Sequence, residues 1–202
     1  MVTPVVVING LGAPRVAALA YGLALRSRGF RVFTAPQRLL GYGDIRLASE
    51  LVAGEVERVR RHTGSDKVHL VGMSLGGLIG LYYLKCAGGA SSVERFVSVG
   101  GPLNGSALAR VLDLVPSRVA HAMAQTSPAH ALMREVRDAA TPEGVRMFSV
   151  GTRGDFITPR ASWDAAGCEP IETPHGVFPL GHWMLFTHPG NHDMVARCLT
   201  VV

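Results

Sequence analysis

Short apolar runs alternate with longer amphipathic stretches along most of the 202-residue chain. The runs are rich in β-branched residues and are bounded by glycine or proline, a pattern typical of strands buried on both faces of a parallel sheet. Six strands are predicted on this basis, at residues 4–9, 30–34, 67–72, 93–99, 145–151 and 169–173. The stretches between them show helical periodicity and predict helices at residues 14–28, 44–62, 75–87 and 191–200.

The alternation of strands and helices predicts the fold class. Each helix carries the chain back to the end of the sheet where the preceding strand began, so that the next strand runs parallel to it. We therefore expect an α/β fold with a doubly wound, mainly parallel, six-stranded sheet. Residues 1–202 are expected to form a single domain. Residues 102–142 interrupt the alternation, since they contain no convincing strand and Pro116 and Pro128 break their short helical patterns. An insertion of this size after a central strand is usually functional, so we expect a helical, lid-like element there.

A serine in a distinctive setting lies between the third predicted strand and the following helix. Residues 72–76 read Gly-Met-Ser-Leu-Gly, which matches the pattern Gly-x-Ser-x-Gly. On a strained strand-to-helix turn the serine hydroxyl projects into the cleft at the carboxyl edge of the sheet, and a Cβ at either flanking glycine would collide with the turn. Ser74 is therefore the candidate nucleophile, with an ordinary glycine-rich packing turn as the alternative.

A serine nucleophile needs a base, and the base needs an orienting group. Asp155 follows the fifth predicted strand, and His182 lies in a predicted apolar loop before the last helix. The order serine, aspartate, histidine is the one that this sheet topology requires. Asp155 could instead cap a helix, and His182 could be an ordinary core residue. The rival histidines are His175, His188 and His192, of which His188 is the strongest, and the fallback acids are Asp164 and Glu172.

Backbone N–H groups are expected to bind the negative oxygen that forms when a serine attacks a carbonyl. One donor is the N–H of Leu75, because it directly follows the nucleophile and opens a helix with a partial positive charge at its N-terminus. The second is expected in the loop after the first strand, where Leu11 is the best candidate. Gly10 and Gly12 let that loop bend inward.

Composition narrows the class of protein further. Apolar residues make up 48% and charged residues 17%, which excludes a disordered chain. No apolar run approaches the ~20 residues that span a bilayer, and no secretory signal is visible, so we expect a cytoplasmic protein without a membrane span. The three cysteines suit neither a disulfide framework nor a zinc site, Cys86 is expected to be buried, and neither metal nor cofactor is expected. The net charge of +5 is spread along the chain rather than concentrated, which argues against nucleic-acid binding.

Taken in order, these segments resemble the α/β-hydrolase superfamily, and within it the small single-domain lipases and esterases. The resemblance is carried by residues 7–12, 72–77, 101–106, 154–159 and 181–182. It implies a minimal version of that fold and a serine hydrolase that cleaves a carboxylic ester or thioester of a hydrophobic acyl or small-molecule substrate. An acyl-enzyme would form on a triad of Ser74, His182 and Asp155. The expected pocket residues are Met73, Leu103, Leu112, Val115 and Trp183.

Two other functions remain open. The same triad could serve an intracellular acyltransferase, thioesterase or lactone-forming enzyme of a biosynthetic pathway, in which the acceptor is not water. The fold could also have become a non-catalytic binding module. A dinucleotide site is excluded, because the third glycine position of its fingerprint holds Arg15 and no acidic residue ends the second strand.

Overall fold

A computed structural model describes residues 2–37, 43–106, 109 and 118–200. Its six strands form one sheet in the order β2-β1-β3-β4-β5-β6, and every neighbouring pair is parallel. The strands are β1 (Val5–Ile8), β2 (Val32–Thr34), β3 (Val68–Met73), β4 (Val93–Val99), β5 (Arg146–Gly151) and β6 (Glu169–Glu172). The predicted doubly wound, six-stranded α/β fold is thereby confirmed.

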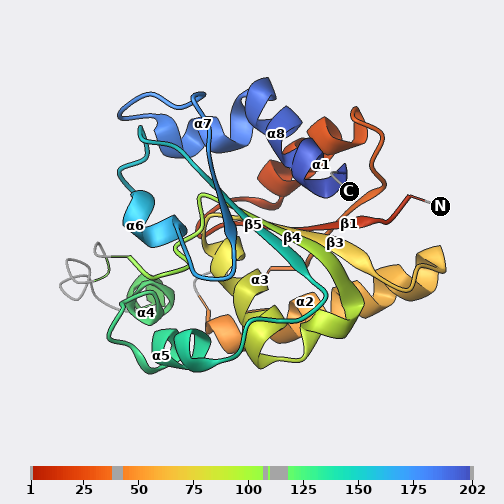
Figure 1. The fold of residues 1–202 in the computed structure, drawn as a ribbon, viewed down its shortest axis with the longest axis horizontal. Helices are drawn as coiled ribbons and strands as arrows, with labels where there is room; N and C mark the ends of the chain where they lie inside the picture. Colours follow the sequence, from red (N-terminus) through yellow and green to blue (C-terminus); the bar gives the residue numbers. More distant parts are fainter. Residues whose placement is uncertain (1, 38–42, 107–108, 110–117, 201–202) are drawn as a thin grey trace.

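Helices cover both faces of this sheet (Figure 1). One face carries α1 (Arg15–Arg26), α7 (Gly181–Thr187) and α8 (Pro189–Thr200), and the other carries α2 (Ile45–Thr63), α3 (Leu75–Cys86) and α5 (Ala131–Asp138). The remaining helical segments are α4 (Arg118–Gln125), α6 (Arg160–Trp163) and the 3₁₀ turn η2 (Gly89–Ser92).

The alternation of side chains along the strands divides the core in two. In β1, Val5 and Val7 pack into the cluster beneath α1 and α8, whereas Val6 and Ile8 pack into the cluster beneath α2 and α3. Successive side chains of a strand point to opposite faces, so a strand with helices on both sides must be apolar throughout. This is why β1 reads as a continuous aliphatic run.

Local signals set the ends of α2. The Asp44 carboxylate caps its N-terminus by accepting hydrogen bonds from the N–H groups of Arg46 (2.7 Å) and Leu47 (3.4 Å). Gly64 ends the helix with a φ of 69°, a conformation that glycine adopts without steric cost. The helix expected at 44–62 is therefore confirmed to within a residue at each end.

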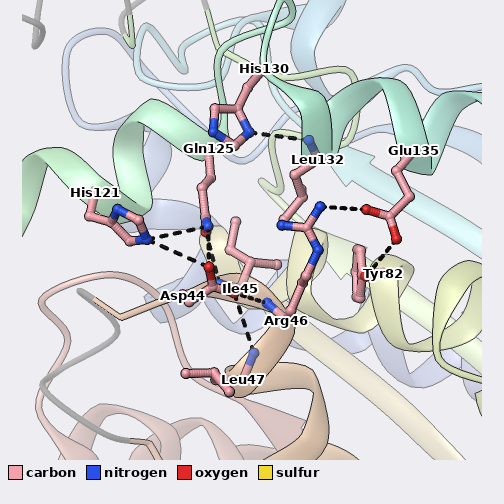
Figure 2. Close-up of polar contacts among 10 residues, drawn as sticks. All are labelled: Asp44, Ile45, Arg46, Leu47, Tyr82, His121, Gln125, His130, Leu132 and Glu135. Atoms are coloured by element: carbon pink, nitrogen blue, oxygen red, sulfur yellow. Dashed lines mark hydrogen bonds and ion pairs between the residues drawn. The ribbon is translucent and has the colours of Figure 1, made fainter.

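The helices expected between residues 102 and 142 are docked onto the α2–α3 face. Figure 2 shows Gln125 of α4 at the N-terminus of α2, where its side chain accepts from Ile45 N (2.8 Å) and donates to Asp44 (2.6 Å). Glu135 of α5 accepts from Arg46 of α2 (2.6 Å) and from the Tyr82 hydroxyl of α3 (2.7 Å). These contacts anchor both helices, while the lid-like role of the insertion stays a prediction.

The cysteines differ from the sequence analysis at one position. All three are free thiols, but Cys86 is partly exposed, contrary to its predicted burial, because it lies at the last turn of α3. Cys168 and Cys198 are buried.

Among the described residues, no helix combines the length and the apolar character that crossing a bilayer requires.

Candidate active site

Ser74 occupies a strained turn between β3 and α3. It is the one non-glycine residue with a positive φ in the described part of the chain, at φ 49° and ψ −124°. A backbone in this region costs about 1–3 kcal/mol and persists only where its surroundings enforce it. Here Ser74 N donates to Val99 O in β4 (2.8 Å), and a Cβ on Gly76 would overlap the Ile8 carbonyl of β1. The glycine in the sequence pattern is thus required by the close approach of α3 to β1.

His182 lies between Ser74 and Asp155, within hydrogen-bonding distance of both. Its Nε2 is 3.0 Å from Ser74 Oγ, and its Nδ1 is 2.7 Å from Asp155 Oδ2. The imidazole and the carboxylate are both buried, and Ser74 lines an open cleft. Three side chains separated by up to 108 positions in the sequence therefore meet in the order that proton transfer from a serine requires.

The Asp155 carboxylate is held by four hydrogen bonds. Besides His182, it accepts from Ile157 N (2.9 Å), Thr158 N (2.9 Å) and the Thr158 hydroxyl (2.6 Å). These bonds fix the turn that leads into α6, but Asp155 does not cap that helix, because its N-cap residue is Pro159, so the alternative role as a helix cap is wrong. The same bonds aim its second oxygen at the imidazole.

His182 belongs to a helix that the sequence interpretation missed. It was expected in a loop, but it lies in the first turn of α7. This helix has only seven residues and is separated from α8 by a break at His188, so its periodicity is too short to detect. A Cβ on Gly181 would overlap the Gly154 backbone. Glycine at residue 181 lets the start of α7 press against the Asp155 loop, which brings the histidine and the aspartate together.

The rival residues make other contacts. The rings of His175 and His188 stack on each other with centroids 4.4 Å apart. His192 Nε2 lies 2.8 Å from the Phe186 carbonyl, and burial lowers the pKa of this histidine. The fallback acids, Asp164 and Glu172, both pair with Arg160. Ser74 therefore has His182 as its histidine partner.

A cleft of about 590 Å³ opens beside Ser74 and His182. Its walls are the loop after β1, the N-terminal half of α1, and α7. The lining includes two expected pocket residues, Met73 and Trp183, and Phe186, which was expected to extend the apolar wall. It also includes three residues that the sequence interpretation missed, Ala17, Ala20 and Tyr21. Small residues near the start of the helix that follows the first loop could have indicated this wall, since they leave space next to the backbone.

Of the other expected pocket residues, Leu103 does not line this cleft. Leu103 is 2% exposed and lies on the opposite side, where it borders a small cavity with residues of α3 and α5. Leu112 and Val115 fall outside the described residues. None of the described residues of the insertion lines this cleft.

The loop after β1 lies directly against the nucleophile. A Cβ on Gly10 would sit 3.0 Å from Ser74 Cβ and 3.7 Å from its Oγ. Leu11 follows and lines the cleft, and Leu75 is the first residue of α3, where N–H groups have no partner within the helix. Both expected oxyanion donors therefore belong to segments that adjoin Ser74.

Exposed aromatic side chains flank the catalytic candidates. Phe156 follows Asp155, Trp183 follows His182, and Phe178 stands nearby in the loop before α7. Their rings lie 6.0 Å apart for Phe156 and Phe178 and 6.5 Å apart for Phe156 and Trp183. All three are at least 47% exposed. Exposed apolar groups clustered at a cleft favour apolar ligands.

No group of histidine, cysteine and acidic side chains suited to a metal ion occurs among the described residues.

The sequence matches a known protein family, and the fold resembles known structures. The model of the alpha/beta hydrolase fold family matches residues 3–129. The structure resembles the mature Bacillus licheniformis lipase BlEst2 with a TM-score of 0.80 and 14% identity, covering 98% of this chain and 92% of that one. It resembles Aspergillus fumigatus lipase B with a TM-score of 0.78 and 18% identity, covering 98% of this chain and 52% of that one.

A third similar structure comes from a study of carboxylesterases of the thaumarchaeon Nitrososphaera gargenis, with a TM-score of 0.66 and 15% identity, covering 98% of this chain and 90% of that one. A search of curated proteins finds no match. At these identities the structural likeness establishes the fold, and the family match covers well over half of the sequence. The chain belongs to the alpha/beta hydrolase fold family.

Proposed function

We propose that the protein is a serine hydrolase that cleaves a carboxylic ester or thioester carrying a hydrophobic acyl group. The observation that carries this proposal is the position of His182, 3.0 Å from Ser74 Oγ on one side and 2.7 Å from Asp155 on the other. The strained backbone of Ser74 and the lipases and carboxylesterases among the similar structures support it.

In the proposed acylation step, Ser74 Oγ attacks the carbonyl carbon of the substrate while His182 Nε2 accepts its proton. Asp155 keeps the imidazole oriented through Nδ1 and stabilises the imidazolium that forms. The N–H groups of Leu11 and Leu75 bind the negative oxygen of the tetrahedral intermediate. His182 then returns the proton to the departing alcohol or thiol, which leaves the acyl group on Ser74.

Deacylation repeats these steps with water as the nucleophile. His182 Nε2 takes a proton from water, the hydroxide adds to the acyl carbonyl, and Ser74 regains its proton as the acid departs. The acyl group occupies the cleft between the loop after β1, α1 and α7. Its apolar wall includes Met73 and Trp183, which agrees with a hydrophobic acyl group.

The test compares hydrolysis of p-nitrophenyl butyrate by the wild type, Ser74→Ala and the control Ser91→Ala. Ser91 is an exposed serine of η2, so its removal leaves the site intact. We expect the Ser74 variant to lose at least about 10³-fold in kcat with an unchanged melting temperature, and the control to match the wild type. A fluorophosphonate should label Ser74, which peptide mass spectrometry locates.

The outcomes separate the candidate functions. Equal turnover by wild type and Ser74→Ala would refute the proposed nucleophile. Turnover that rises with added alcohols or amines, with ester or amide products, would favour an acyltransferase over a hydrolase. Neither turnover nor labelling of the wild type would favour a binding module.

A further inference from the structure

A side chain outside the cleft holds the loop that faces the nucleophile. Gln37, in the segment after β2, donates a hydrogen bond from Nε2 to the carbonyl oxygen of Gly10 (2.7 Å). The same carbonyl lies 3.5 Å from Ala13 N, a length at which the bond across this turn is weak. Gln37 therefore makes the stronger contact with the peptide unit that joins Gly10 to Leu11.

This bond determines which way the Leu11 N–H points. The Gly10–Leu11 peptide is trans, and in a trans peptide the C=O and N–H of one unit point in opposite directions. In the sheet, β2 and β3 flank β1 on opposite sides, so Gln37 reaches Gly10 from the β2 side while Ser74 follows β3. A Gly10 carbonyl directed to Gln37 leaves the Leu11 N–H directed toward the side of Ser74.

The surrounding contacts leave this N–H available. The Leu11 N–H makes no hydrogen bond to any of the described residues. The far end of the loop is fixed independently, because the buried Asn9 side chain donates from Nδ2 to the carbonyls of Ala13 and Pro14, both at 3.0 Å. Gly12 closes the turn with a φ of 65°. The remaining rotation is that of the Gly10–Leu11 peptide, which Gln37 restrains.

We propose that Gln37 is a positioning residue for the oxyanion hole, which holds the Gly10–Leu11 peptide so that the Leu11 N–H faces the oxygen developing on the substrate. This inference rests on the proposed function. Gln37 lines two cavities on the β2 side and does not line the cleft that contains Ser74, so it acts through the backbone and not on the substrate. A free peptide could turn, and preorganisation of the donor would be lost at the moment of reaction.

Two substitutions of similar size test this role. Gln37→Met removes the donor at every pH. Gln37→Glu replaces it with a carboxylate that repels the carbonyl at neutral pH and becomes a donor when protonated. Loss of a complete oxyanion donor costs about 10²–10³ in kcat, so we expect each variant to lose roughly 10–100-fold in kcat on p-nitrophenyl butyrate at pH 8, with KM changed less than about twofold.

The pH dependence distinguishes positioning from a structural role. The ratio of variant to wild-type kcat should rise as the pH falls from 8 to 5.5 for Gln37→Glu, and should stay constant for Gln37→Met. Taking the ratio to wild type removes the titration of the catalytic histidine. Melting temperatures and labelling by a fluorophosphonate, whose adduct also needs the oxyanion hole, are measured on the same samples.

The results separate this inference from the proposed function. An active wild type, an inactive Ser74→Ala and Gln37 variants with full kcat would overturn the role of Gln37 alone. A kcat loss matched by an equal rise in KM, or by unfolding of both variants, would assign Gln37 a structural role and overturn the inference. A wild type with neither turnover nor labelling would overturn the proposed function and this inference together.

Discussion

His69 should make the fold sensitive to acid. It lies within β3, is 5% exposed, and has no hydrogen-bond partner for Nδ1 in the described part of the chain. Burial lowers the pKa of His69 to about 4; Glu94, 4.0 Å away, acts to raise it, and Arg95 on the neighbouring strand acts to lower it. The folded protein therefore keeps this imidazole neutral at pH values where the unfolded chain has already protonated it.

The sign and size of the effect follow from the two pKa values. Because the folded value lies below the unfolded value of 6.5, protonation of the unfolded chain begins first as the pH falls. The stability that depends on keeping His69 neutral is fully present above pH 6.5. It declines below that pH and is fully lost near pH 4. The gap between the folded and unfolded pKa values corresponds to about 3 kcal/mol of stability at 1.36 kcal/mol per pH unit, of which about 2 kcal/mol is already lost at pH 4.5.

The assay is urea unfolding of the wild type and His69→Leu at several pH values between 7.5 and 4.5. Leucine fills a similar volume in an apolar strand, so we expect equal or greater stability at pH 7, since a buried unpaired nitrogen is removed. The stability of the variant should exceed that of the wild type increasingly as the pH falls, by about 2 kcal/mol near pH 4.5. His69→Gln, which also lacks the titrating ring, should show the same flatter profile. Parallel profiles for the wild type and both variants would refute this reasoning.

Three further predictions concern buried and paired groups. Thr158→Val removes the hydroxyl that donates to the Asp155 carboxylate and should lower the free energy of unfolding by about 2 kcal/mol and kcat by about tenfold; unchanged calorimetry and kinetics would contradict it. Ser98→Ala removes a fully buried hydroxyl that has no partner in the described structure, so urea unfolding should show a gain of about 1 kcal/mol, and a loss would contradict it. Bonding to Tyr82, and then to Arg46, holds the pKa of Glu135 below its usual range, so its contribution is present above the unfolded value of about 4.3 and is lost as the pH falls through the folded value. Glu135→Gln should therefore melt below the wild type at pH 7, with a difference that shrinks at pH 3; a constant difference would argue against the ion pair.

The sheet could be predicted from the sequence because its physical cause is local. A strand with helices on both sides must be apolar at every position, and β1 shows this in four consecutive buried residues. The turn at Ser74 was predictable for a related reason, because the space between α3 and β1 admits only glycine at residue 76. The short helix α7 was missed because seven residues complete barely two turns.

The position of the cleft and the hydrogen bond from Gln37 to Gly10 depend on contacts between distant elements. The hydrophobic periodicity of the sequence does not encode such contacts. The sequence indicated which residues lie at the carboxyl edge of the sheet, but not on which side of Ser74 space would remain. Leu103 faces the core beneath α3, whereas Tyr21 of α1 lines the cleft. The bond between Gln37 and Gly10 depends on β2 lying next to β1, which is a property of the strand order.

The order of the strands also bears on how the chain folds during synthesis. The first four strands in the chain, through Val99, are neighbours in the sheet, so this half can form a sheet before the remainder has been made. Ser74 is fixed in its turn by this half, whereas Asp155 follows β5 and His182 follows β6. Helix α8 then packs against α1, and Arg28, just after the end of α1, binds Asp193 of α8 (2.7 Å). A nascent chain would thus carry Ser74 without its two partners, and His182 could reach Ser74 only after the last strand of the sheet had been made.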